Sequence, residues 1–63
     1  MISYEQFQRL HYLHKQQGLT VPQIARVFGM RVDEVARHLG RLLQAGKVRA
    51  EQRDGETYYL AES

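Results

Sequence analysis

The feature that most constrains the fold is a change of hydrophobic period at Gly46. Before it, apolar residues such as Val35, Leu39 and Leu42 recur three or four positions apart, which is the spacing of one helix face. After it, apolar and polar residues alternate through "KVRAEQ", and "TYYLA" is rich in strand-forming residues. The Asp-Gly of "RDGE" between these stretches is a strong hairpin-turn signal. The sequence therefore predicts helices first and one β-hairpin after them.

The first predicted helix covers residues 3–17. Ser3 can cap it, and Gln6 follows at the spacing of a capping box, in which each residue satisfies a backbone N–H of the other. Gly18 is a typical residue just beyond a helix end. The stretch is therefore predicted to fold as one helix that ends before Gly18.

Two further helices are predicted before the hairpin. The second is about two turns long: it begins after Thr20, which forms another capping box with Gln23, and it stops at Gly29. The third begins near Val32 and runs to about Ala45. A tight turn, "FGM", separates the two helices.

A short helix, a tight turn, a longer helix and a hairpin make a winged helix-turn-helix. The stretches "LTVPQIARVFGMRVDEVARHLGRLLQAGKV" and "RDGETYYLA" are similar to bacterial winged helix-turn-helix transcriptional regulators over most of the chain. The resemblance implies an α+β, mainly α fold with three helices and a β-hairpin wing, as one domain over residues 1–63. It also implies double-stranded DNA binding, in transcriptional regulation or as the DNA-binding part of a larger protein.

Two other resemblances point to different settings for the same fold. Residues 2–30 also look like the amino-terminal helix-turn-helix of insertion-sequence transposases. Small winged-helix proteins associated with bacterial ferrous-iron transport are similar in outline, but the wing cysteines often found in that family are missing here. Because of this second resemblance, the alternative function is a protein-docking module, for example a small regulator of a transport system.

Basic charge is concentrated in the second and third predicted helices and the hairpin. Residues 22–53 hold seven basic and three acidic residues, whereas the rest of the chain holds two basic and four acidic ones. A basic region of this kind is typical of a protein that binds a polyanion. A solvated surface with scattered charges is the alternative.

The third helix is the one expected to enter the DNA major groove. Arg37 and Arg41 are four residues apart on the side opposite its apolar stripe, and Gly40 adds no side chain to that side. The resemblance implies contacts near the start of this helix and from Arg53 in the wing, while other basic side chains add phosphate contacts. The expected DNA-binding residues are Arg26, Arg31, Val32, Arg37, His38, Arg41, Lys47, Arg49 and Arg53.

The stretch "RVDE" at residues 31–34 departs from that family pattern. Regulators of this type usually carry Ser or Thr at the first position and small polar or basic residues after it. Asp33 and Glu34 repel phosphates, although a carboxylate can accept a hydrogen bond from cytosine. Arg37 can also simply pair with Asp33 on a solvated face, and an exposed Val32 suits a protein partner. Whether these acids exclude DNA is therefore the main question about function.

Other chemistry has little support in the sequence. His11 and His14 share a helix face, but a zinc site needs three or four ligands, so no metal or cofactor is expected. No nucleophile-base arrangement or phosphate-binding glycine loop is present, so we expect no enzyme activity.

The expected setting is cytoplasmic, without membrane insertion. The chain has no cysteine, no apolar run of roughly 20 residues and no signal-peptide layout at its start. Many helix-turn-helix proteins bind as dimers, so a homodimer is among the expected forms, although no stretch stands out as a dimerisation helix.

Overall fold

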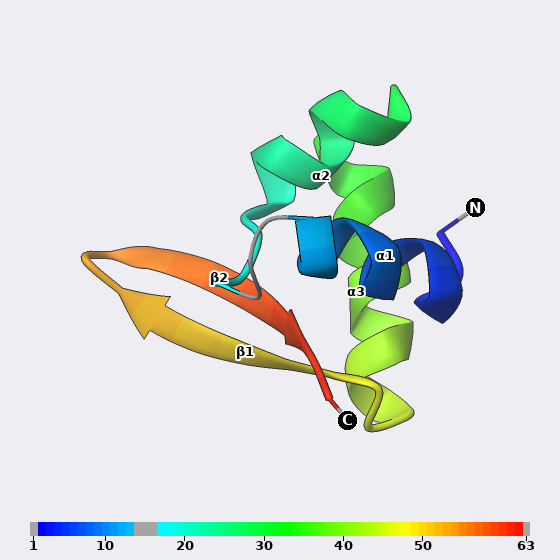
Figure 1. Cartoon of the computed structure of the whole chain (residues 1–63). Helices are drawn as coiled ribbons and strands as arrows, with labels where there is room; N and C mark the ends of the chain where they lie inside the picture. Colours follow the sequence, from blue (N-terminus) through cyan, green and yellow to red (C-terminus); the bar gives the residue numbers. More distant parts are fainter. Residues whose placement is uncertain (1, 14–16, 63) are drawn as a thin grey trace.

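The structure, a computed structural model, describes residues 2–13 and 17–62. Three helices precede an antiparallel hairpin of two strands, in the order α1 (Tyr4–Leu13), α2 (Val21–Phe28), α3 (Val32–Gln44), β1 (Val48–Arg53) and β2 (Glu56–Ala61). The helices gather at one side, and the hairpin projects away from them as a wing (Figure 1). The predicted winged helix-turn-helix is confirmed.

The predicted helix starts are confirmed by their capping bonds. At α1, the Gln6 backbone N–H donates to Ser3 Oγ at 3.2 Å, and the Ser3 N–H donates to Gln6 Oε1 at 3.0 Å. Thr20 and Gln23 make the same reciprocal pair of bonds at α2. These bonds satisfy N–H groups that a helix start leaves without partners, which is why local sequence was sufficient to place both starts.

The predicted first helix is confirmed over Tyr4–Leu13, but it does not include Gln17 as predicted. The structure assigns helix only to Tyr4–Leu13; residues 14–16 lie outside the described residues, and Gln17 is not helical. The physical reason follows at Leu19, whose backbone pairs with that of Tyr59 in β2 through bonds of 3.0 and 2.8 Å. The chain must therefore be extended before α2 begins.

The hairpin turn is the one predicted from Asp-Gly. Arg53 pairs with Glu56, which leaves a loop of two residues, and both have positive φ: 50° at Asp54 and 79° at Gly55. This is a type I′ turn, whose twist matches that of the flanking strands. The register therefore places Arg49 opposite Leu60 and Glu51 opposite Tyr58.

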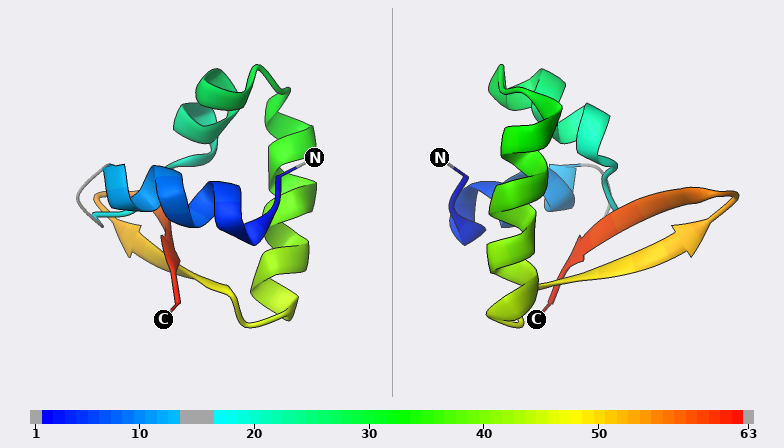
Figure 2. Two further views of the ribbon diagram at one scale, coloured as in Figure 1. Left: turned by 45° about the vertical axis from the view of Figure 1, so that its right-hand side comes forward. Right: turned by 180° about the vertical axis from the view of Figure 1, so that it is seen from behind.

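The core lies where the three helices meet the inner half of the wing. Its fully buried side chains come from α1, α2, α3 and the segment before α2: Phe7, Leu19, Ile24, Val35 and Leu39. Val48 of β1 joins this cluster, and Tyr59 packs against it from β2. The turned views show α1 crossing α3 on one side, while α3 faces the viewer from the other side (Figure 2). The fold thus leaves one long side of α3 free of other helices.

Candidate nucleic-acid interface

The uncovered side of α3 carries the two arginines that the sequence placed there. Val35 and Leu39 are fully buried, whereas Arg37 and Arg41 are exposed. Gly40 lies between the arginines, and a side chain added there would meet nothing within 4 Å. The predicted facing of α3 is confirmed, with a basic and sterically open outer surface.

Glu34 has a structural task at the start of α3. Its carboxylate Oε1 accepts a hydrogen bond from the backbone N–H of Arg31 at 3.3 Å. Arg31 occupies the cap position in an extended conformation, but its side chain has no acceptor with which to return the bond. Glu34 therefore serves the helix start, a role that the sequence analysis did not recognise.

Asp33 lies between two arginines. Its carboxylate is 3.5 Å from Arg31 Nε and 3.9 Å from Arg37 Nη2. All three side chains are more than half exposed, so each ion pair contributes little to stability. The two pairs matter more for the local charge, because two arginines next to Asp33 offset the carboxylate that would repel DNA phosphates.

Val32 and His38 complete the predicted α3 contacts, and they differ in exposure. Val32 is 53% exposed at the first turn, beside the acids. His38 is half-buried at the border of the apolar stripe. The structure thus leaves Val32 available to a partner and His38 only partly so.

Three other predicted cations have no carboxylate within 4 Å among residues 2–13 and 17–62. Arg26 is exposed on α2, Arg41 is exposed on α3, and Lys47 follows α3. The Lys47 amine lies 5.1 Å from the ring centroid of Tyr4, a cation–π distance. Of the predicted contacts, these three carry the least compensated charge.

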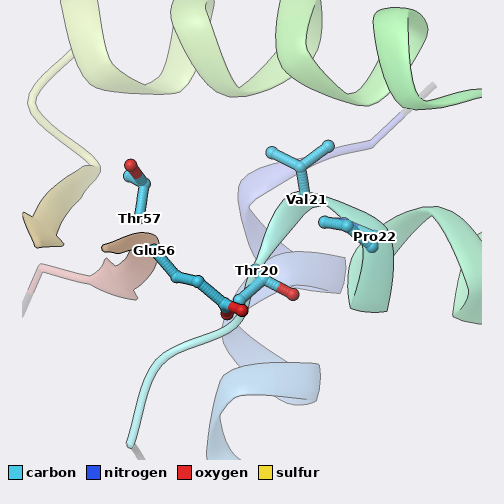
Figure 3. Close-up of a pocket in the computed structure, with 5 residues that line it drawn as sticks. All are labelled: Thr20, Val21, Pro22, Glu56 and Thr57. Atoms are coloured by element: carbon cyan, nitrogen blue, oxygen red, sulfur yellow. The ribbon is translucent and has the colours of Figure 1, made fainter. Parts of the chain in front are cut away.

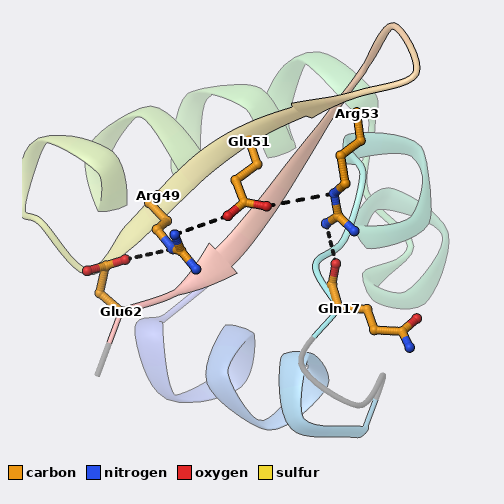
Figure 4. Close-up of polar contacts among 5 residues, drawn as sticks. All are labelled: Gln17, Arg49, Glu51, Arg53 and Glu62. Carbon is orange, nitrogen blue, oxygen red and sulfur yellow. Dashed lines mark hydrogen bonds and ion pairs between the residues drawn. The ribbon is translucent and has the colours of Figure 1, made fainter.

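The wing arginines are engaged with carboxylates of the wing itself (Figure 4). Arg49 lies 3.0 Å from both Glu51 and Glu62, and Arg53 lies 3.7 Å from Glu51. Arg53 also donates a hydrogen bond to the Gln17 carbonyl. The alternation of Arg49, Glu51 and Arg53 along one strand was the signal for this network. Its link to Glu62 depends on the hairpin register.

A shallow pocket lies where the start of α2 faces the start of β2 (Figure 3). It is lined by Thr20, Val21, Pro22, Glu56 and Thr57. A single carboxylate with two hydroxyls supplies neither a nucleophile and base nor a metal-ligand set. Across the described residues, no three His, Asp or Glu side chains come together as a potential metal site. His14, the second of the two histidines considered as ligands, lies outside them.

His11 is a buried histidine of α1. It is 7% exposed and stacks on Phe7 with ring centroids 6.1 Å apart. Its Nε2 has no hydrogen-bond partner within the part of the chain that is described. Burial, and secondarily the positive charge of Arg49, lower the pKa of His11 below the ordinary 6.5. His11 is therefore a neutral core residue at pH 7.

The three-helix body, the exposed basic side of α3 and the projecting wing define a winged helix-turn-helix DNA-binding domain. A family model described as the MarR family matches residues 2–56. The chain therefore belongs to the MarR family of winged helix-turn-helix transcriptional regulators, which bind double-stranded DNA.

The other comparisons add no closer relative. Neither a curated protein nor a solved structure matches the chain. None of the helices has the length and apolar character needed to cross a bilayer, as far as the described residues extend.

Proposed function

We propose that this chain binds double-stranded DNA with α3 in the major groove and the wing alongside. It acts in transcriptional regulation, by itself or as the DNA-binding part of a larger protein. The observation that carries the proposal is that both α3 acids have partners within the protein: Asp33 lies between two arginines, and Glu34 accepts a hydrogen bond from the Arg31 N–H. Asp33 and Glu34, the acids expected to repel DNA phosphates, thus each have partners at the start of α3. The major groove is about wide enough for such a helix.

The residues proposed to contact DNA are chiefly those of α3 and its neighbours. Arg37 and Arg41 face outward from α3, and Val32 is exposed at its first turn, where an apolar side chain can contact a thymine methyl group. Arg26 and Lys47 add uncompensated charge for phosphates. Arg31, His38 and Arg49 are secondary members of this set, because each is partly engaged or covered within the protein.

Salt dependence of DNA affinity tests this proposal. Each phosphate that a protein neutralises releases counterions, so affinity falls steeply as salt rises. We expect fluorescence anisotropy with a labelled random-sequence duplex to give measurable binding at about 50 mM salt and a loss of about tenfold or more at about 200 mM. Absence of binding at the lower salt concentration would contradict the proposal.

Protein docking is the second candidate, and the exposure of Val32 favours it. Val32 and Val27 are 53% and 54% exposed, so both apolar side chains are available to a partner. A partner that covers them would gain affinity from apolar burial, and that term is insensitive to moderate salt. A partner complex whose affinity does not change between the two salt concentrations would support docking over DNA binding.

We also propose that the chain binds DNA as a homodimer, because MarR-family regulators typically dimerise. A two-fold protein reads two half-sites one helical turn of DNA apart. Light scattering after size exclusion measures the mass of the free protein and of its DNA complex. A single chain per duplex in the complex would contradict the dimer.

A further inference from the structure

Arg53 has three partners within the protein: Gln17 belongs to the body, whereas Glu51 and Tyr58 belong to the wing itself. Its Nη2 donates a hydrogen bond to the carbonyl of Gln17, and its Nε lies 3.7 Å from Glu51 (Figure 4). Its guanidinium carbon lies 4.1 Å from the ring centroid of Tyr58. The side chain is 42% exposed, against 82% for Arg31. The guanidinium therefore has its partners within the protein before any ligand arrives.

Gly18 makes this approach of Arg53 feasible. Its φ of +98° is a backbone conformation that other residues rarely adopt. A Cβ at Gly18 would lie 2.7 Å from Arg53 Nη2, closer than real Cβ contacts, and 3.1 Å from Tyr58 Cβ, which is a tight contact. A glycine at this position thus permits both the turn of the chain and the seat of the guanidinium.

The wing is attached to the body of the protein at more than one level along its length. A two-stranded hairpin alone is marginally stable in water. The backbone pair between Leu19 and Tyr59 ties β2 down in its inner half. Arg53 is the last residue of β1, directly before the turn, so its contact with Gln17 ties the hairpin down further out.

We propose that Arg53 is a positioning residue: with Gln17, Gly18 and Tyr58 it forms a wing clamp that fixes the angle between the wing and α3. Arg53 thereby acts through the wing in place of the direct DNA contact that the family resemblance implies. The wing clamp is proposed for the DNA-free protein, and only its effect on DNA affinity rests on the proposed function.

Two substitutions break the wing clamp in different ways. Arg53→Lys keeps the positive charge but loses the planar group that stacks on Tyr58 and reaches Gln17. Gly18→Ala keeps every charge and intrudes on the clamp. Gly46→Ala is the matched control, because Gly46 also has a positive φ (+72°) but has nothing within 4 Å of an added Cβ.

Amide hydrogen exchange in DNA-free protein tests the clamp directly. We expect exchange in residues 56–59 to rise roughly tenfold in Arg53→Lys and Gly18→Ala, relative to the α3 amides of the same sample. Gly46→Ala should leave that ratio unchanged. If Gly18→Ala does not fold, Arg53→Lys decides the matter. An unchanged ratio in the folded clamp variants would overturn the proposal.

DNA titration separates positioning from direct contact. A positioning role predicts that Arg53→Lys and Gly18→Ala each weaken binding roughly tenfold without changing the slope of affinity against salt. Direct contact predicts that Arg53→Lys keeps its affinity, and that Arg53→Gln lowers the slope by about 0.9. That second pattern would overturn the positioning role. If the unaltered protein fails to bind, the proposed function fails, and hydrogen exchange still decides the clamp.

Discussion

The Asp33 carboxylate lies 3.9 Å from Arg37 Nη2, one turn further along α3, and 3.5 Å from Arg31 on its other side. This arrangement places a cluster of paired charges at the start of α3, the helix that we propose enters the DNA major groove. The arrangement also reconciles two interpretations of the sequence, a surface ion pair between Asp33 and Arg37 and DNA binding through α3. Arg37 does pair with Asp33 on a solvated face, and the same pair reduces the repulsion that Asp33 would exert on DNA phosphates.

Substitution of Asp33 measures that compensation. Asp33→Asn removes one negative charge near the DNA phosphates, so we expect tighter binding to random-sequence duplex, with a larger gain at low salt. Stability should change by less than about 0.5 kcal/mol, because exposed ion pairs contribute little. Anisotropy titrations and thermal unfolding provide the two measurements. Weaker binding in this variant would mean that Asp33 itself takes part in recognition.

Arg41 and Arg9 form a matched pair of exposed helical arginines. Neither has a carboxylate within 4 Å among the described residues, but Arg41 lies on the outer side of α3 and Arg9 lies on α1. If Arg41 contacts a phosphate, Arg41→Ala lowers the slope of log affinity against log salt by about 0.9. Arg9→Ala should leave the slope unchanged. Equal effects of the two substitutions would show that binding follows net charge alone.

Leu39 tests the facing of α3. Its side chain is fully buried, so Leu39→Ala should lower the free energy of unfolding by about 2–5 kcal/mol. The exposed Leu43, 38% exposed on the same helix, is the comparison, and Leu43→Ala should cost clearly less. Chemical denaturation gives both values. A loss below about 0.5 kcal/mol at Leu39 would be incompatible with the described core.

His11 makes stability depend on pH. Its pKa is lowered in the folded protein by burial and then by Arg49, so the unfolded chain takes up the proton first. The stabilising effect of a neutral His11 is therefore complete above about pH 6.5 and declines as pH falls below it. Unfolding free energies measured from about pH 7.5 to 5 should fall, and His11→Leu should flatten the curve.

His38→Gln is the control for this pH dependence. His38 is half-buried on α3, away from the Phe7 stack, and its removal should leave the decline in place. A curve that stays equally steep in His11→Leu would assign the dependence to another group.

Local signals in the sequence were sufficient for the helix starts and the hairpin. Thr20 with Gln23 and the Asp54–Gly55 turn are determined by neighbouring residues, so their geometry could be predicted without the fold. The non-helical conformation at Gln17 could not be predicted in this way, because the chain there leads into the backbone pairing of Leu19 with Tyr59, forty residues away. Contacts between distant segments leave no local pattern.

The same distinction between local signals and contacts of distant segments applies to the candidate interface. The outward facing of Arg37 and Arg41 follows from helix periodicity alone. The contact of Arg53 with Gln17 depends on how the wing crosses the chain before α2, so no local pattern indicated it, and the resemblance implied a DNA contact for Arg53 instead. The positive charge of Arg53 suggested a DNA contact but could not indicate its partner within the protein.

The most direct test of the account is an NMR titration with random-sequence duplex DNA at two salt concentrations. We predict amide shifts concentrated in residues 31–44 and 47–55 that fade at the higher salt concentration, because α3 and the wing face the DNA and phosphate contacts weaken with salt. No shifts at low salt, or shifts centred on α1, would contradict DNA binding through α3 and direct attention to a protein partner.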